Sequence, residues 1–148
     1  MKTYGNEIID CEIYTNKVFV YGTLMKGFCN YKRYLKGRIS RITPGKTYGL
    51  LYHLPGGYPG LLPGNGIIEG EIVEPVDEKL LKSLDRLEGY NKGSSNNLYI
   101  REPRSISTEN GEEVTCWIYI YKDERYAKEN GILVPDGNWR KFVDRRRN

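Results

Sequence analysis

Short strand-like runs with few helical stretches between them constrain the fold of this chain most. The candidate strands, marked by alternating or continuous apolar residues, are 17–21, 38–43, 47–54, 67–75, 98–107 and 114–122. Helical periodicity predicts helices only at 30–36, at 78–88 and over a short stretch at 122–130. Several strands without a long helix after each one favour an α+β fold over a doubly wound parallel sheet.

Turn residues separate these runs. Two clusters rich in proline and glycine, 55–60 and 63–66, are predicted to be turns or loops. Glu109-Asn110-Gly111-Glu112 lies between two strand runs and predicts a hairpin. Gly45-Lys46-Thr47 is similar to the end of a phosphate-binding loop, but Ser40 stands where the first glycine is required and no helix follows. We therefore predict that this tripeptide is a turn entering a strand.

Length and composition are those of one globular domain. The chain has 148 residues, of which 39% are hydrophobic, so it can bury a core of its own. We expect a single domain over 1–148, with an N-terminal extension at 1–16 and a solvated basic tail at about 140–148. No apolar stretch approaches a membrane span, and residues 1–16 lack the hydrophobic segment of a signal peptide, so we expect a cytoplasmic protein.

Cysteine and histidine usage argues against a metal site. The three cysteines, Cys11, Cys29 and Cys116, are an odd number without metal-ligand spacing, and reduced thiols are expected. His53 is the single histidine of the chain and no Cys-x-x-Cys motif is present. A zinc site is therefore not expected.

The net charge of +4 raises the alternative of nucleic-acid binding. Tyrosines, 13 in number, could stack on bases beside the basic residues. Many of them, however, fall in strand-like segments such as Trp117-Ile118-Tyr119-Ile120-Tyr121, where alternation explains them as core or barrel-wall residues. We expect no nucleic-acid partner.

A carboxylate on the apolar side of the 78–88 helix is the first candidate functional group. The apolar positions of this helix are Leu80, Leu81, Leu84 and Leu87. Glu88 stands four residues after Leu84, so it shares their face, and Asp77 is the predicted N-cap. Gly89 suits a left-handed C-terminal cap. Partial burial and the negative end of the helix dipole would both raise the pKa of Glu88, as a general base working near neutrality requires.

The second candidate is the turn that ends the apolar run Val18-Phe19-Val20. Tyr21-Gly22-Thr23-Leu24-Met25 follows this run directly and is predicted to be a glycine-containing turn. Backbone N–H groups in such a turn can hold a carboxylate or an oxyanion.

These two segments together resemble the γ-glutamylcyclotransferase-like family, and most closely the branch with γ-glutamylamine cyclotransferase and plant AIG2-like proteins. The first motif is Val18–Leu24 followed by Gly27 and Asn30, and the second is Leu84-Asp85-x-x-Glu88-Gly89 followed by Tyr99 and Arg101. The resemblance covers roughly residues 17–123, and the ordered pair of motifs is more specific than either motif alone.

The resemblance implies a small mixed β-barrel flanked by a few helices, with the site in its mouth. It assigns Glu88 as the proton acceptor and Tyr21, Gly22, Thr23 and Leu24 as the γ-glutamyl-binding loop. We add Tyr99 as a substrate-binding residue, because one tyrosine hydroxyl of the strand segments could reach the substrate. The implied reaction closes the substrate on itself, releasing 5-oxoproline and a free amine without a metal or another cofactor.

Several points stay open at this level. The amine that leaves is undetermined, and a monomer and a homodimer are equally compatible with the sequence. The polar stretch Asn91–Asn97 is longer than expected for the γ-glutamylamine branch and is predicted to be a mobile loop beside the site. The alternative from another class is a non-catalytic small-molecule-binding or regulatory module of the same fold.

Overall fold

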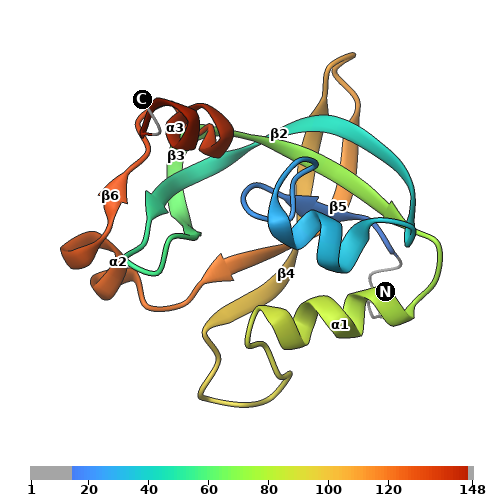
Figure 1. The fold of residues 1–148 in the computed structure, drawn as a ribbon, viewed down its shortest axis with the longest axis horizontal. Coiled ribbons are helices and arrows are strands. Elements are labelled where there is room, and N and C mark those ends of the chain that lie inside the picture. The colour runs from blue at the N-terminus through green and yellow to red at the C-terminus, as the bar shows by residue number, and fades with distance from the viewer. Residues whose placement is uncertain (1–14, 147–148) are drawn as a thin grey trace, which may run out of the picture.

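Five strands close into a barrel in the computed structural model, which describes residues 15–146 (Figure 1). These strands are β1 (Val18–Val20), β2 (Ile39–His53), β3 (Pro59–Pro75), β4 (Tyr99–Thr108) and β5 (Glu113–Tyr121). They follow the order β3-β1-β5-β4-β2, and pairing of β2 with β3 closes the ring. Among these described strands only β1 and β5 pair in parallel, so the barrel is mixed. The sixth strand, β6 (Ile132–Leu133), extends the sheet from β2.

Helices cover the barrel from outside. They are the π-helical turn η1 (Tyr31–Leu35) and the α-helices α1 (Lys79–Leu87), α2 (Glu124–Asn130) and α3 (Trp139–Arg146). In Figure 1, α1 and η1 lie side by side, and α3 lies over another part of the barrel, near β2 and β3. The α+β barrel with a few flanking helices that the sequence predicted is confirmed.

The core fills the barrel and extends under the helices. All three residues of β1 are buried, because this strand is covered on both faces, which explains its continuous apolar run. Leu80 and Leu84 of α1 are fully buried, as their spacing predicted. The Asp77 carboxylate accepts a hydrogen bond from the Lys79 N–H at 2.9 Å, so it contributes to the start of α1 although the helix begins after Glu78.

Two strand predictions were wrong in the same way. The candidate strands 38–43 and 47–54 are one strand, β2, and Gly45-Lys46-Thr47 lies inside it rather than in a turn. Thr47 is buried, and a Cβ at Gly45 would lie 2.7 Å from a methyl carbon of Ile106. The glycine therefore marks a place inside the strand where neighbouring isoleucine side chains leave no room for a Cβ, not a chain reversal.

The 63–66 cluster is also not a turn. It lies inside β3, where Gly49 pairs with Gly66 but the next residue, Leu50, pairs with Leu62. The three residues between these partners are left out of the register as a bulge. The proline and glycine residues at 63–66 correctly indicated an irregular backbone, but the irregularity is a bulge within a strand and not a turn. The hairpin at 109–112 is confirmed, since the Gly111 N–H donates to the Thr108 carbonyl at 3.1 Å.

Most of the predicted basic tail is helical, and its residues Lys141, Arg145 and Arg146 are exposed. Residues 139–146 form α3, in which Trp139 is 2% exposed. The many charged residues of this segment gave no helical apolar pattern, although Trp139 packs the helix against the barrel. Residues 147–148, together with 1–14 of the predicted N-terminal extension and its Cys11, lie outside the described residues.

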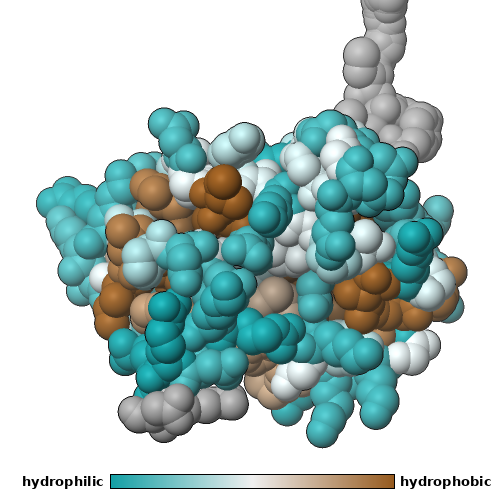
Figure 2. Space-filling model, turned by 90° about the horizontal axis from the view of Figure 1, so that it is seen from above, coloured by the Kyte–Doolittle hydropathy of each residue, from teal (hydrophilic) through white to brown (hydrophobic). Residues whose placement is uncertain are grey.

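The surface seen from above is mainly hydrophilic, with separate apolar areas (Figure 2). No helix within residues 15–146 is long and apolar enough to cross a membrane.

Candidate functional site

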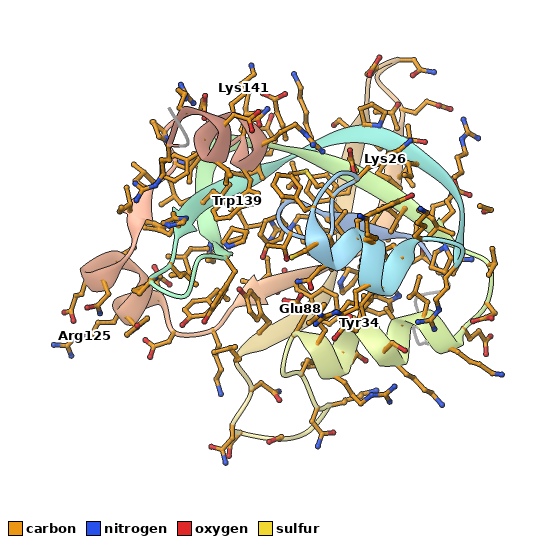
Figure 3. The ribbon with its side chains drawn as sticks, viewed as in Figure 1. Lys26, Tyr34, Glu88, Arg125, Trp139 and Lys141 are labelled. Atoms are coloured by element: carbon orange, nitrogen blue, oxygen red, sulfur yellow. The ribbon has the colours of Figure 1, made fainter. Side chains whose placement is uncertain are left out.

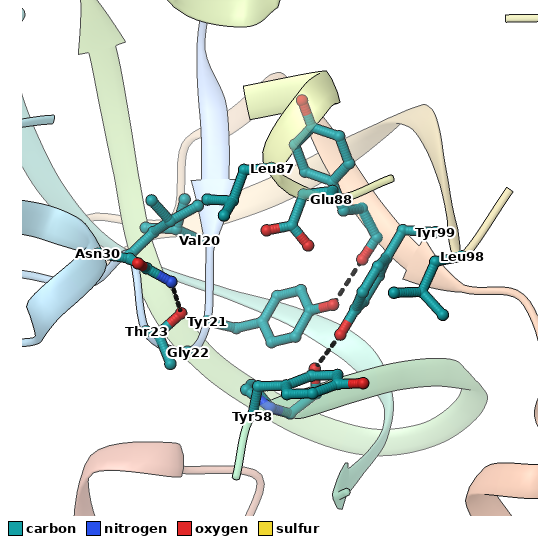
Figure 4. A pocket seen from close by; sticks show the side chains of 13 residues that line it. Val20, Tyr21, Gly22, Thr23, Asn30, Tyr58, Leu87, Glu88, Leu98 and Tyr99 are labelled. Carbon is teal, nitrogen blue, oxygen red and sulfur yellow. Dashed lines mark hydrogen bonds between the residues drawn. The ribbon is translucent and has the colours of Figure 1, made fainter. Parts of the chain in front are cut away.

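A cavity of about 260 Å³ opens where the end of β1, the end of α1 and the start of β4 meet. Its lining consists of Val20, Tyr21, Gly22, Thr23, Leu24, Asn30, Tyr58, Pro59, Leu87, Glu88, Leu98, Tyr99 and Tyr119. All six residues that the sequence singled out are therefore in one place, although Tyr21 and Glu88 are 67 positions apart. Figure 4 shows the Glu88 carboxylate pointing into this cavity, toward the ring of Tyr21.

The turn after β1 presents unused hydrogen-bond donors. The Met25 N–H donates to the Gly22 carbonyl at 3.0 Å, which closes a turn with Thr23 and Leu24 at its centre. The N–H groups of Thr23 and Leu24 donate to no residue within 15–146. Successive free N–H groups in a turn form a concave site for an anion.

Neighbouring groups hold this turn in place. The Asn30 side-chain amide donates to Oγ1 of Thr23 at 2.8 Å (Figure 4). The Tyr31 N–H donates to the Thr23 carbonyl at 3.2 Å. A Cβ added at Gly22 would collide with the Cγ of Pro59, so only glycine permits this approach of the turn to β3. Asn30 belonged to the first sequence motif but had no predicted role.

Two tyrosine hydroxyls join the walls of the cavity. Tyr21 donates to the Tyr119 carbonyl and Tyr99 donates to the Pro59 carbonyl, each at 2.6 Å. Burial raises the pKa of both phenols well above the ordinary value, so both stay neutral. Since each proton is used in the wall, the oxygen of each hydroxyl is what remains to accept a hydrogen bond from a ligand.

The C-terminus of α1 directs Glu88 into the cavity. Gly89 has φ of +65°, the Tyr90 N–H donates to the Asp85 carbonyl at 2.8 Å, and the Gly89 N–H donates to the Arg86 carbonyl at 3.3 Å. This pair of bonds is a Schellman motif, which confirms the predicted left-handed cap. The chain turns away immediately after Glu88, and the side chain remains on the face of Leu84.

The Glu88 carboxylate is poised to exchange a proton. Among the described residues it has no hydrogen-bond or ion-pair partner. Burial raises its pKa from 4.5 to about 7. A carboxylate that is desolvated, unpaired and faces a cavity can accept a proton near neutral pH and return it.

A second acidic group lies behind the cavity wall, and its role was not predicted. Asp85 accepts hydrogen bonds from Nε of Arg101 at 2.8 Å and from the Tyr119 hydroxyl at 2.7 Å. The Arg101 guanidinium in turn stacks over the Trp117 ring, 4.4 Å from its centroid. Asp85 and Arg101 both belong to the second sequence motif, which was the only indication in the sequence that they matter. That they pair with each other and with Tyr119 is seen only in the structure.

Three lining residues, Tyr58, Pro59 and Leu98, had little sequence signal. Tyr58 and Pro59 come from the cluster at 55–60, and Leu98 directly follows the 91–97 loop. The Leu98 N–H donates to the Gly89 carbonyl at 3.1 Å, which places this loop directly beside the site. Its predicted mobility stays a prediction.

The chemistry available in the cavity is that of one proton acceptor and a set of neutral donors. The described part of the chain contains no group of three or more His, Cys, Asp and Glu side chains arranged to hold a metal ion. The arrangement suits a substrate that carries an anionic or developing anionic group near the turn and a labile proton near Glu88.

Comparison with known proteins gives consistent matches. The model of the "Gamma-glutamyl cyclotransferase, AIG2-like" family matches residues 18–141. A Methanocaldococcus jannaschii protein with a provisional γ-glutamylcyclotransferase name is 37% identical over 130 residues, which cover 84% of this chain and 96% of that protein. The γ-L-glutamyl-butirosin B γ-glutamyl cyclotransferase of Niallia circulans is 36% identical over 117 residues, covering 78% and 73% of the two chains.

A solved structure agrees with these sequence matches. The crystal structure of an AIG2-like protein from Mus musculus superimposes with a TM-score of 0.63 at 29% identity, over 84% of this chain and 87% of the mouse chain.

Proposed function

Because the chain belongs to the AIG2-like γ-glutamyl cyclotransferase family, we propose that it cleaves a γ-glutamyl amide into 5-oxoproline and a free amine. The observation that carries this proposal is the cavity itself. An unpaired glutamate, Glu88, with a pKa of about 7 shares it with the free N–H groups of Thr23 and Leu24. The observed geometry supports proton transfer at one side of a small ligand and anion binding at another.

The nucleophile in this reaction belongs to the substrate. Glu88 takes a proton from the substrate α-ammonium, and the free α-amine attacks the γ-carbonyl carbon to close a five-membered ring. Glu88 delivers this proton to the leaving nitrogen as the amide C–N bond breaks, and the second proton that the attacking nitrogen loses passes to the released amine, which departs as an ammonium ion. The new lactam C–N bond replaces the broken amide bond, so no water is consumed and no metal or protein nucleophile is needed.

Positioning supplies most of the remaining catalysis. A folded γ-glutamyl group in a cavity of about 260 Å³ holds its α-amine against its own γ-carbonyl, which removes much of the entropic barrier to ring closure. The N–H groups of Thr23 and Leu24 bind either the substrate α-carboxylate or the oxyanion that develops on the γ-carbonyl. The hydroxyl oxygens of Tyr21 and Tyr99 can accept hydrogen bonds from the α-ammonium.

Product analysis tests the reaction type. A panel of γ-glutamyl amides is incubated with the protein in ¹⁸O-labelled water, and the products are identified by mass spectrometry. We expect 5-oxoproline without solvent ¹⁸O, and no reaction of amides whose α-amine is acetylated. Free glutamate containing ¹⁸O would identify a hydrolase. Binding of γ-glutamyl amides without any product would instead favour the non-catalytic module.

Replacing the proposed base gives the first prediction. Glu88→Gln keeps the size of the side chain but cannot accept a proton, so we expect kcat to fall by about 10²–10⁴-fold. The control is Glu78→Gln, which changes an exposed glutamate at the other end of the same helix and should leave kcat unchanged. Steady-state release of 5-oxoproline measures both. Activity of Glu88→Gln within a few-fold of the parent would refute the assignment.

A further inference from the structure

The loop that follows the substrate-binding turn is fastened to the barrel through Lys26. The Lys26 N–H donates to Oε1 of Glu71 at 2.8 Å, and Glu71 lies on β3 opposite Val20 of β1. Further along the loop, the Phe28 N–H donates to the Met25 carbonyl at 3.1 Å. The backbone just after the turn is therefore bound by one carboxylate of the barrel wall.

Arg140 of the C-terminal helix completes this attachment from the other side. Its Nη2 donates to the Lys26 carbonyl at 2.7 Å and lies 3.5 Å from Oε2 of Glu71. Its guanidinium also lies over the Phe28 ring, 5.0 Å from the centroid. One side chain thus contacts the backbone of the loop, an aromatic ring of the loop and the carboxylate that holds the loop.

The helix that carries Arg140 is itself anchored. Trp139 is buried and stacks on His53 of β2 with ring centroids 5.2 Å apart. Figure 3 places Trp139 on the barrel side of α3 and Lys141 on its outer side. The position of Arg140, between a buried tryptophan and an exposed lysine, is consequently set by the packing of the whole helix.

We infer that Arg140 is a positioning residue for the substrate-binding turn. Arg140 holds the Lys26 carbonyl beside Glu71 and thereby keeps the N–H groups of Thr23 and Leu24 available to the cavity. Leu24 lies 116 positions before Arg140 in the chain. The inference rests on the proposed function for its effect on catalysis, whereas its effect on the loop is independent of any reaction. Arg140 does not line the cavity, so it acts through the turn and not on the substrate.

The test compares Arg140→Met with Arg145→Met in the full chain. Methionine keeps an apolar side chain of similar length but cannot donate or carry charge. Arg145 is on the same helix and pairs with Asp136 at 2.7 Å, so its replacement controls for general damage to α3. The first measurement is residue-resolved amide hydrogen exchange at Lys26 and Phe28, whose N–H groups are bonded in the intact loop.

We expect exchange at these amides to accelerate about 10- to 100-fold in Arg140→Met only, the range that loss of one charge-assisted hydrogen bond corresponds to. The second measurement is kcat/KM for 5-oxoproline release, which should fall by a similar factor. The acid limb of its pH profile should stay in place, because Glu88 is not touched.

The outcomes distinguish the role of Arg140 in holding the loop from its role in positioning the substrate-binding turn. Unchanged exchange in Arg140→Met, or equal acceleration in Arg145→Met, overturns the role of Arg140. Faster exchange with unchanged kcat/KM, or with a displaced acid limb, overturns the positioning of the turn. If the parent protein releases no 5-oxoproline from any amide, the proposed function fails, while the exchange result still decides whether Arg140 holds the loop.

Discussion

At the scale of single residues, Glu88 shows a conflict between stability and chemistry. Burial without a partner disfavours its charged form, yet the proposed reaction needs that form to accept a proton. Asp85, one turn earlier on α1, has the opposite environment, since Arg101 and Tyr119 both donate to it. The two carboxylates therefore differ in environment: Asp85 is hydrogen-bonded in the wall of the cavity, whereas Glu88 is unpaired and available for the proposed proton transfer.

The pH dependence of activity follows from the raised pKa of Glu88. Because the base must be charged, kcat/KM should fall as the pH drops through about 7. Measured between pH 5 and pH 9, the profile should show this acid limb for several amides. An acid limb near pH 4.5, the ordinary value for a glutamate, would mean that Glu88 is solvated in the free protein.

The same shift predicts that the parent protein loses stability as the pH rises. The folded state holds the Glu88 proton up to about pH 7, whereas the unfolded state releases it near 4.5, so this contribution is full below 4.5 and is lost as the pH rises through 7. At pH 8, Glu88→Gln should therefore raise the free energy of unfolding by on the order of 2 kcal/mol. Denaturant titrations at pH 8 and pH 5 measure it; a gain that is equal at both pH values would contradict the desolvation argument.

At the scale of secondary-structure elements, the ends of β1 and α1 matter more than their middles. Each element supplies buried apolar residues along its length and one irregular terminus that faces the cavity. In the turn after β1, the N–H groups of two residues have no partner among the described residues. The Schellman motif after α1 ends the helix directly after the carboxylate that faces the cavity. Irregular backbone at these two places therefore supplies the hydrogen-bond donors and the carboxylate that the proposed function requires.

Replacing the glycine of the α1 cap tests this role of the element end. Gly89→Ala forces a side chain onto φ of +65° and places a Cβ 3.2 Å from the Cβ of Leu98. We expect a loss of about 1–2 kcal/mol in stability and a fall in kcat/KM of roughly tenfold or more, as Glu88 is displaced. Unfolding and turnover are measured on the same preparation.

Gly111→Ala provides the matched control. Gly111 has φ of +83° with open space where a Cβ would lie, and it belongs to the β4–β5 hairpin. Its replacement should cost a similar amount of stability with turnover unchanged. If both variants lose activity in proportion to stability, the cap of α1 has no specific role.

At the scale of the whole molecule, closure of the barrel joins segments from all parts of the chain around one cavity. The turn after β1, the end of α1 and the starts of β3 and β4 meet at this cavity. β1 pairs with both β3 and β5, β5 pairs with β4, and pairing of β2 with β3 closes the ring. The C-terminal helix then packs on β2 through Trp139 and contacts the loop after the turn through Arg140. Residues near both ends of the described chain thus support the same site.

The anchoring of α3 predicts the effect of removing its buried residue. Trp139→Ala should lower the free energy of unfolding by about 3–5 kcal/mol, because the indole is 2% exposed and its removal leaves a cavity against β2. Lys141→Ala, at the exposed position on the same helix, should change stability by less than about 0.5 kcal/mol. Denaturant unfolding of both variants checks this, and equal small effects would show that α3 is not part of the cooperative fold.

Local periodicity allowed the sequence by itself to determine β1, β4 and β5, the helix that ends just before Glu88, its glycine cap and the turn after Val20. These features depend on contacts within a few residues, where side-chain spacing dictates which face is apolar. Together with the resemblance to a family, they were enough to name six of the residues that line the cavity.

Only the tertiary structure decided the features that depend on distant segments. Gly45 and the 63–66 cluster carry turn residues, yet strand pairing keeps both inside long strands, since a ladder of hydrogen bonds outweighs local turn preference. The pairing of Asp85 with Tyr119 and of Arg140 with Lys26 joins positions 34 and 114 residues apart. Such contacts arise when the barrel closes, and no local pattern encodes which side chains closure brings together.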